Sequence, residues 1–208
     1  MILIGQYDSP FVRRVGLALT LYDMPFDHRP WSAFGDADMI RPYNPLMRVP
    51  TLVLDDGIAL TDSHVILGHL DGLMPPDRVL MPRDAAARVR AARIIGLACG
   101  AADAAVSLFY ELRLHEAASE ALAGRRRTQI AGAFVALQDE VAGASGDHLF
   151  EGRVGHADIA VAVAWRFLAE AHPGLLPAAD FPQVAAHAAR LEASAPFQAI
   201  CQPFVPPA

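Results

Sequence analysis

The sequence predicts an α/β domain over residues 1–72, a linker over residues 73–82 and an all-helical domain over residues 83–208. Two observations support this division. Short apolar runs with strand character occur in the first region, whereas the chain beyond Arg83 shows helical spacing of its apolar residues and no convincing strand. Between the two regions, Leu-Met-Pro-Pro-Asp-Arg-Val-Leu-Met-Pro carries three prolines, as interdomain linkers often do.

The first domain is predicted to be a β-α-β unit followed by a β-β-α unit. Residues 1–7 begin with a buried apolar strand that Asp8-Ser9-Pro10 interrupts. Ser9 is suited to the N-cap of the following helix, residues 11–22, and Pro10 to its first position. The other elements expected in this domain are a strand over residues 26–29, a weak helical segment over 36–40, strands over 51–54 and 58–61, and a helix that begins at Asp62-Ser63.

Residues 46–66 bring a proline, a hairpin and a polar helix start into one small volume. We expect Asp55-Asp56-Gly57 to form a two-residue hairpin loop, because Asp-Gly supplies the residues that such a turn needs. A proline at the head of a strand, here Pro50, can free the preceding backbone for an outside partner. The N–H groups at a helix start attract carboxylates. The stretch therefore predicts a binding site for an extended, anionic, peptide-like ligand.

The second domain is predicted to contain helices alone. Residues 155–170 are apolar on nearly every face, which is typical of a central buried helix. The other helices are expected at residues 83–115, 120–142, 181–193 and 195–202.

The composition indicates a well-filled core, with 53% hydrophobic and 19% charged residues in 208. The net charge of −6 argues against a nucleic-acid or anionic-membrane surface, and Arg125-Arg126-Arg127, the only basic run, is explained by a solvated helix face. No signal peptide and no membrane-spanning stretch are expected. The two cysteines and eight histidines show no metal-binding spacing, so we expect no metal, and reduced thiols in an intracellular protein.

Four motifs along the chain carry a family resemblance. They are Ser9-Pro10-Phe11-Val12-Arg13-Arg14-Val15, Asn44 to Leu52, Asp62-Ser63, and Gly152 followed by Ala157-Asp158-Ile159. In this order and spacing, the sequence resembles the soluble glutathione transferase superfamily over essentially its whole length. The resemblance implies a thioredoxin-like first domain, glutathione as co-substrate, a homodimer, and a cytoplasmic enzyme of detoxification. The Ser-Pro helix start is most similar to serine-type members, such as the tau class and its bacterial relatives.

Ser9 is the catalytic residue that the resemblance implies. A thiol with a pKa near 8.5 is little ionised at neutral pH, so an enzyme gains by stabilising the thiolate, which is the nucleophile. A serine hydroxyl at a helix start can donate a hydrogen bond to the sulfur where the helix dipole also favours an anion. Two alternatives stay open: Ser9 as a helix cap only, and Tyr7 as the hydroxyl donor. Because residue 9 is not cysteine, thiol–disulfide exchange through that position is excluded.

The glutathione-binding residues are implied by the same resemblance. Ser63 would take the γ-glutamyl α-carboxylate and Asp62 would pair with the α-ammonium, although an ordinary helix N-terminus fits the local sequence equally well. Val49, before a cis Pro50, would offer its backbone to the cysteinyl residue like an added strand. Arg48 would pair with the glycyl carboxylate, or is a surface arginine.

The electrophile pocket is the least decipherable part of the sequence. Candidate walls are Phe11, Phe109, Tyr110 and Arg113, each of which is also explained as a core or interface residue. Gly155 stands where relatives usually have Ser or Thr as a helix cap, and Asp158 is expected to be structural. The first hypothesis is conjugation of glutathione to an electrophilic small molecule. The alternatives are glutathione-dependent isomerisation or dehalogenation, and a non-catalytic interaction module of the same fold.

Overall fold

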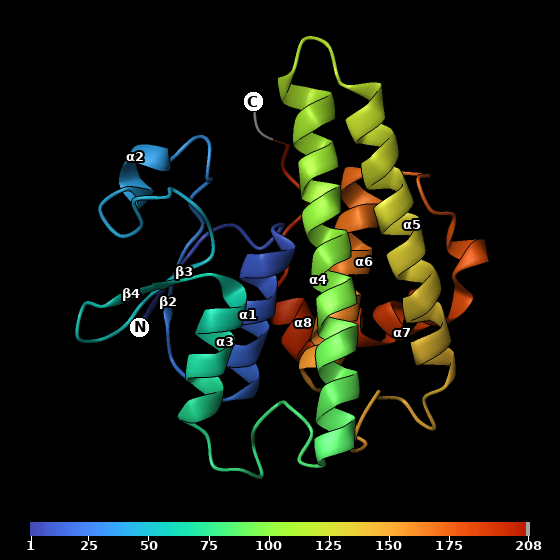
Figure 1. Ribbon diagram of the computed structural model, residues 1–208. Helices are drawn as coiled ribbons and strands as arrows, with labels where there is room; N and C mark the ends of the chain where they lie inside the picture. Colours follow the sequence, from blue (N-terminus) through green and yellow to red (C-terminus); the bar gives the residue numbers. More distant parts are fainter. Residues whose placement is uncertain (207–208) are drawn as a thin grey trace. The chain divides into compact units, whose positions relative to one another are not determined.

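The computed structural model describes residues 1–206, which fall into two compact units. One unit comprises Met1–Leu80 together with the segment from Ser194 onward, and the other comprises Met81–Ala193. All strands of the described chain lie in the first unit, and the second is helical (Figure 1). The predicted fold class, a thioredoxin-like α/β domain and an all-α domain, is confirmed. The sequence places residues 83–208 in one helical domain, whereas the structure groups the segment from Ser194 with the α/β unit.

The first unit is built on a four-stranded sheet of order β2-β1-β3-β4. Strand β1 pairs in parallel with β2 and antiparallel with β3, and β3 pairs antiparallel with β4. Because side chains alternate across a sheet, Ile4 packs with Ile40 of the short helix α2 on one face, while Leu3 approaches α1 on the other. The strands and this helix are β1 (Ile2–Ile4), β2 (Asp27–Arg29), α2 (Ala37–Ile40), β3 (Thr51–Val53) and β4 (Ala59–Thr61).

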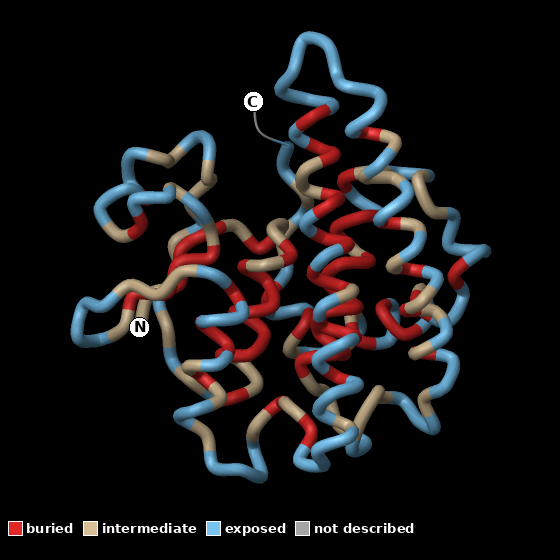
Figure 2. The backbone as a smooth tube through the Cα atoms, in the orientation of Figure 1, coloured by how far each residue is buried: buried red, intermediate tan, exposed pale blue. Residues whose placement is uncertain are grey.

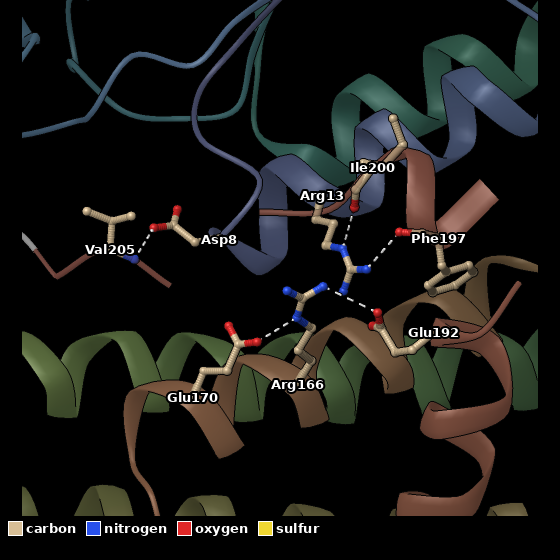
Figure 3. A network of polar contacts seen from close by, with 8 residues as sticks. All are labelled: Asp8, Arg13, Arg166, Glu170, Glu192, Phe197, Ile200 and Val205. Atoms are coloured by element: carbon tan, nitrogen blue, oxygen red, sulfur yellow. Dashed lines mark hydrogen bonds and ion pairs between the residues drawn. The ribbon is translucent and has the colours of Figure 1, made fainter. Parts of the chain in front are cut away.

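Three more helices complete this unit: α1 (Pro10–Leu21), α3 (Ser63–Gly72) and α8 (Ala195–Ala199). Helices α1 and α3 pack against each other (Figure 1). The helix expected over residues 195–202 ends at Ala199, three residues early. At Ile200 the backbone leaves helical geometry, and the carbonyl of this residue accepts a 2.7 Å hydrogen bond from Arg13 Nε (Figure 3).

The hairpin between β3 and β4 differs from the expected two-residue loop. Leu54 N donates to the carbonyl of Ile58, and Gly57 N donates back to the carbonyl of Leu54. Asp55, Asp56 and Gly57 therefore form a three-residue loop, with Gly57 at a φ of 88°. A turn that ends in a left-handed glycine is the common three-residue hairpin connection, and the Asp-Asp-Gly sequence suits it equally well.

The second unit consists of long helices packed around α6, of whose sixteen residues thirteen are buried (Figure 2). Its prediction as a central buried helix is confirmed. Helix α4 packs on α5 and α6, and α7 packs on α5 and α6. Arg166 joins α6 to the end of α7 through ion pairs to Glu170 and Glu192 (Figure 3). The helices are α4 (Ala85–Leu114), α5 (Glu120–Ala142), α6 (His156–Ala171), the 3-10 turn η1 (Ala178–Asp180) and α7 (Pro182–Glu192).

Helix α4 is the one helix of the described chain that is long and apolar enough to cross a membrane. Half of its most apolar stretch is buried inside the protein. A core helix of a globular domain passes the same test of length and composition, so this finding is weak evidence for a membrane span.

Candidate active site

Ser9 lies at the start of α1, where it is the N-cap as predicted. Its Oγ accepts a 3.4 Å hydrogen bond from Val12 N. The loop before it is tied to the C-terminal segment, since Tyr7 N donates to Gln202 Oε1 at 3.2 Å. Val205 N also donates to Asp8 Oδ2 at 3.0 Å (Figure 3). Ser9 itself is only half-buried. Ser9 thus lies on a loop that is held by hydrogen bonds, and the residue is partly exposed.

The Val49–Pro50 peptide bond, immediately before β3, is cis, as the resemblance implied. Gly5, just after β1, lies against this segment with a φ of 129°. A Cβ at Gly5 would come within 2.8 Å of Val49 Cβ and 2.5 Å of Val12 Cγ2, which no real side chain tolerates. Gly5 therefore lets Val49 approach the start of the Ser9 loop. This role of Gly5 is not among those predicted from the sequence, although a lone glycine after an apolar strand is a signal.

Asn44 fixes the loop that leads to Val49. This buried side chain donates from Nδ2 at 3.0 Å to the Arg48 carbonyl, and lies at the same distance from Thr51 Oγ1 and Thr61 Oγ1. Its Oδ1 accepts from Leu46 N. A buried amide so well satisfied specifies one conformation, so the backbone of residues 46–49 is held against β3 and β4. The Arg48 side chain is exposed, which fits both the ligand role and the surface alternative.

Helix α3 begins at Asp62-Ser63, as the sequence predicts. Asp62 is the N-cap, exposed, with a φ of 71°, and its Oδ1 accepts a 2.7 Å hydrogen bond from His64 N. A left-handed backbone is uncommon outside glycine but tolerated by Asp and Asn, and such conformations cluster at functional sites. Ser63 is 3% exposed, and its Oγ accepts from Arg14 NH1 at 3.3 Å.

Tyr7, the alternative to Ser9 as hydroxyl donor to the thiolate, is a packed aromatic residue. Its ring stacks on His28 with 3.8 Å between ring centroids, and burial raises the pKa of Tyr7 to about 12. Burial also lowers the pKa of His28, whose Nε2 lies 2.8 Å from the Gly5 carbonyl oxygen. The Tyr7 hydroxyl is therefore protonated at neutral pH.

The four candidate electrophile contacts are divided between the two units. Phe11 is half-buried in α1. Phe109 is buried in the helical unit, where its ring meets Tyr110 and His172 edge-on, so it contributes to that unit's core. Tyr110 is 36% exposed, and Arg113 lies over the Phe109 ring. No group of three or more His, Cys, Asp or Glu that could hold a metal ion occurs among residues 1–206.

The structure has a thioredoxin-like sheet, a cis-proline segment before β3, two polar helix starts and a separate helical unit. These features define the class of two-domain, thioredoxin-like proteins. Family profiles agree with this class. The glutathione S-transferase N-terminal domain matches residues 3–78, and the glutathione S-transferase C-terminal domain matches residues 116–190. The chain belongs to the glutathione S-transferase family.

Solved structures support the same assignment over the full length. A glutathione S-transferase from Methylobacterium radiotolerans, in complex with glutathione sulfonate, has a TM-score of 0.88 and 28% identity, covering 100% of this chain and 98% of the other. A family member from Pseudomonas fluorescens Pf-5 with bound glutathione has a TM-score of 0.81 and 32% identity, covering 98% and 99%.

Curated relatives match over shorter stretches. The uncharacterized GST-like protein YibF of Escherichia coli (strain K12) is 33% identical over 104 residues, 50% of this chain and 51% of YibF. Glutathione S-transferase U1 of Arabidopsis thaliana is 39% identical over 70 residues, 33% of this chain and 31% of that protein. The chain thus spans about half of the length of YibF and about a third of that of glutathione S-transferase U1.

Proposed function

We propose that this protein is a glutathione transferase of the serine type, in which Ser9 stabilises the thiolate of bound glutathione. The observation that carries the proposal is the hydrogen bond from Val12 N to Ser9 Oγ. Because the oxygen accepts from the backbone, its own proton is left to donate to a sulfur anion. The dipole of the twelve-residue helix α1 favours the same anion. The glutathione bound to the Pseudomonas fluorescens relative supports the choice of thiol.

The remaining proposed contacts to glutathione come from the start of α3 and from the segment that precedes Pro50. Ser63 binds the γ-glutamyl α-carboxylate through its hydroxyl and its N–H, and the exposed Asp62 carboxylate pairs with the α-ammonium. The backbone of Val49, before Pro50, binds the cysteinyl residue as an added strand would. Arg48 pairs with the glycyl carboxylate.

In the reaction the thiolate sulfur forms a bond to an electrophilic carbon of a small molecule. The leaving group departs with the electron pair of the broken bond, or, in an addition, the pair moves into the substrate and is protonated. Phe11, Tyr110 and Arg113 remain the proposed contacts of the electrophile, and the buried Phe109 packs against Tyr110 and Arg113.

The fold alone does not determine which glutathione-dependent reaction a protein catalyses. A maleylacetoacetate isomerase from the genus Methylobacterium and Ure2p, at 20% and 15% identity, share this fold. Glutathione-dependent isomerisation or dehalogenation is therefore the second candidate, since it uses the same site. Product analysis separates the reactions: conjugation consumes the thiol, isomerisation returns it, and dehalogenation releases halide. A non-catalytic interaction module has no need for Ser9 and is contradicted by any glutathione-dependent turnover.

Two measurements test the proposal. The purified protein should be retained on immobilised glutathione and eluted by free glutathione. Ser9→Ala should then raise the thiol pKa of bound glutathione by about one to two units, and lower turnover near pH 7 roughly ten- to hundredfold, because a lost hydrogen bond to an anion costs about 1.5–3 kcal/mol. Thiolate absorbance against pH gives the pKa.

Ser119→Ala is the matched control. Ser119 caps α5 with the same geometry, accepting from Leu122 N at 3.4 Å, but it lies in the helical unit. Each substitution should cost about 1 kcal/mol of stability as a lost cap. If Ser9→Ala moves the thiol pKa and the turnover no more than Ser119→Ala does, Ser9 is a helix cap only.

We also propose that the protein forms a homodimer and acts in the cytoplasm, as the resemblance implies. Light scattering coupled to gel filtration tests the assembly, and a monomer at micromolar concentration contradicts it. Fractionation of cells tests the location.

A further inference from the structure

Residues 200–205 follow α8 without forming a helix or a strand, and they begin at a fixed point. That point is Ile200, which is 5% exposed. Its carbonyl accepts a 2.7 Å hydrogen bond from Nε of Arg13 in α1, a side chain that is itself 2% exposed (Figure 3). A hydrogen bond to a buried charged group is stronger than one between neutral groups. Gln202, two residues further on, is therefore held close to α1.

Two hydrogen bonds connect residues 200–205 to the loop of residues 5–9, which carries Ser9. Gln202 Oε1 accepts from Tyr7 N at 3.2 Å, and Asp8 Oδ2 accepts from Val205 N at 3.0 Å (Figure 3). The two pairs are 195 and 197 residues apart in the sequence. A distant part of the chain thus bonds to the two consecutive residues that precede Ser9.

The bond to Gln202 satisfies a backbone group that the loop itself leaves without an acceptor. Inside the loop, Ser9 N donates to the Gln6 carbonyl at 3.1 Å. Tyr7 is 9% exposed, and within residues 1–206 its N–H finds an acceptor only in the Gln202 side chain. A buried N–H without a partner is costly, so the loop has to move if the Gln202 oxygen is removed.

Such a movement would reach Ser9, because this residue lies between two points that hold the chain. On one side α1 starts at Pro10, and on the other side Gln202 holds the Tyr7 backbone. A hydrogen bond weakens steeply when its geometry changes, and a catalytic group has to be held within about 0.5 Å of its productive position. The side chain of Gln202 is therefore in a position to control how well the Ser9 hydroxyl donates.

We propose that Gln202 is a positioning residue for Ser9. Its side chain holds the Tyr7 backbone and so keeps the Ser9 hydroxyl where it can donate to the glutathione thiolate. The inference rests on the proposed function, in which Ser9 stabilises that thiolate. Gln202 does not contact glutathione and acts through the loop.

Gln202→Met tests the proposal, because it removes the oxygen acceptor and keeps a flexible side chain of similar length. The thiol pKa of bound glutathione should rise by about 0.5–1 unit, and turnover near pH 7 should fall roughly three- to tenfold. Turnover should recover as the pH rises above the new thiol pKa, and affinity for glutathione should stay within about twofold of wild type. Thiolate absorbance against pH and calorimetry give the two quantities. An unchanged thiol pKa, or a loss of affinity without a pKa shift, would overturn the proposal.

Gln138→Met is the matched control. Gln138 Oε1 also accepts from a distant backbone group, Val184 N at 3.1 Å, but both residues lie in the helical unit. Each substitution should lower the melting temperature by about 2–4 °C, as the loss of one hydrogen bond does in a protein of this size. Only Gln202→Met should change the thiol pKa. An equal pKa shift in the two variants would show a general loss of stability and overturn the proposal.

A double variant tests whether Gln202 acts through Ser9. Once Ser9→Ala has removed the hydroxyl, its position no longer matters. Adding Gln202→Met to Ser9→Ala should therefore move the thiol pKa by no more than about 0.2 units. A further rise of about 0.5 units or more would show that Gln202 acts independently of Ser9, against the proposal.

The single variants distinguish this inference from the proposed function. If wild type does not bind glutathione, or if Ser9→Ala leaves the thiol pKa unchanged, the proposed function fails and the role of Gln202 fails with it. If Ser9→Ala raises the thiol pKa and Gln202→Met does not, only the role of Gln202 is wrong.

Discussion

The starts of helices α3 and α6 each carry an aspartate, and the two side chains differ in their burial and in the number of backbone N–H groups that they accept from. Asp62 at α3 is exposed, and its Oδ1 accepts from His64 N. Asp158, three residues into the α6 start, is fully buried, and both of its oxygens are used by the chain: Oδ2 accepts from Gly155 N and Oδ1 from Leu149 N, each at 2.9 Å.

Asp158 is also 3.3 Å from the Nε2 of buried His187 in α7. Arg190 NH2 lies 3.1 Å from the other ring nitrogen of His187. An aspartate at a helix start is thus structural when the chain already occupies its oxygens. It can serve a ligand when it is exposed and its surroundings leave it accessible.

The largest effect is expected from Asp158→Ala, which should lower the free energy of unfolding by about 3–5 kcal/mol. It removes the acceptor of two backbone N–H groups and one partner of a buried pair. Urea denaturation measures the loss. Asp84→Ala is the control, because Asp84 is an exposed cap that accepts from Ala87 N at 2.8 Å and should cost about 1 kcal/mol. Equal losses in the two variants would remove the distinction between buried and exposed caps.

A smaller effect, on binding rather than stability, is expected from Asp62→Asn. Asparagine keeps the cap and tolerates the left-handed backbone, so only the charge is lost. Glutathione affinity should fall roughly ten- to hundredfold, while the free energy of unfolding changes by less than about 0.5 kcal/mol and the thiol pKa hardly moves. Calorimetry beside urea denaturation gives both numbers. A variant that loses stability but not affinity would make Asp62 a structural residue like Asp158.

Tyr7→Phe should have a weaker effect, with turnover near pH 7 within about threefold of wild type if Ser9 holds the thiolate. A fall of tenfold or more would instead assign the hydroxyl to Tyr7. The substitution also has a pH signature. The folded pKa of about 12 exceeds the usual value of 10.0, so wild-type stability is complete below about pH 10 and declines as the pH rises toward 12. Tyr7→Phe removes that part of the decline in urea denaturation at alkaline pH.

Local patterns predicted much of the fold. Ser9-Pro10 predicted the start of α1, and the apolar spacing of residues 120–142 predicted both ends of α5. The Val49–Pro50 geometry came from the family resemblance, since the dipeptide alone favours trans.

What the sequence could not predict depends on residues far apart in the chain. Arginines on a helix indicate a solvent-exposed face, yet Arg13 and Arg14 are buried because their acceptors lie 187 and 49 residues away. The same contacts end α8 at Ala199 and connect α1 to Ser63. Gly5 likewise matters through Val49, which no local pattern reveals.

The smallest effect is expected at Gly155, the N-cap of α6, which has no side chain to accept a hydrogen bond from the helix. Its φ of −131° and ψ of 177° are extended backbone that any residue adopts, so Gly155→Ser carries no conformational cost. The new hydroxyl can accept from Asp158 N, and with the existing bond from Gly155 N to Asp158 Oδ2 it would complete a capping box. Stability in urea should rise by a few tenths of a kcal/mol, whereas Gly155→Ala, which adds the carbon without the oxygen, should lower it. Neither variant should change glutathione affinity, because this helix start supports the fold. If serine is no more stable than alanine, the hydroxyl makes no bond and Asp158 caps α6 alone.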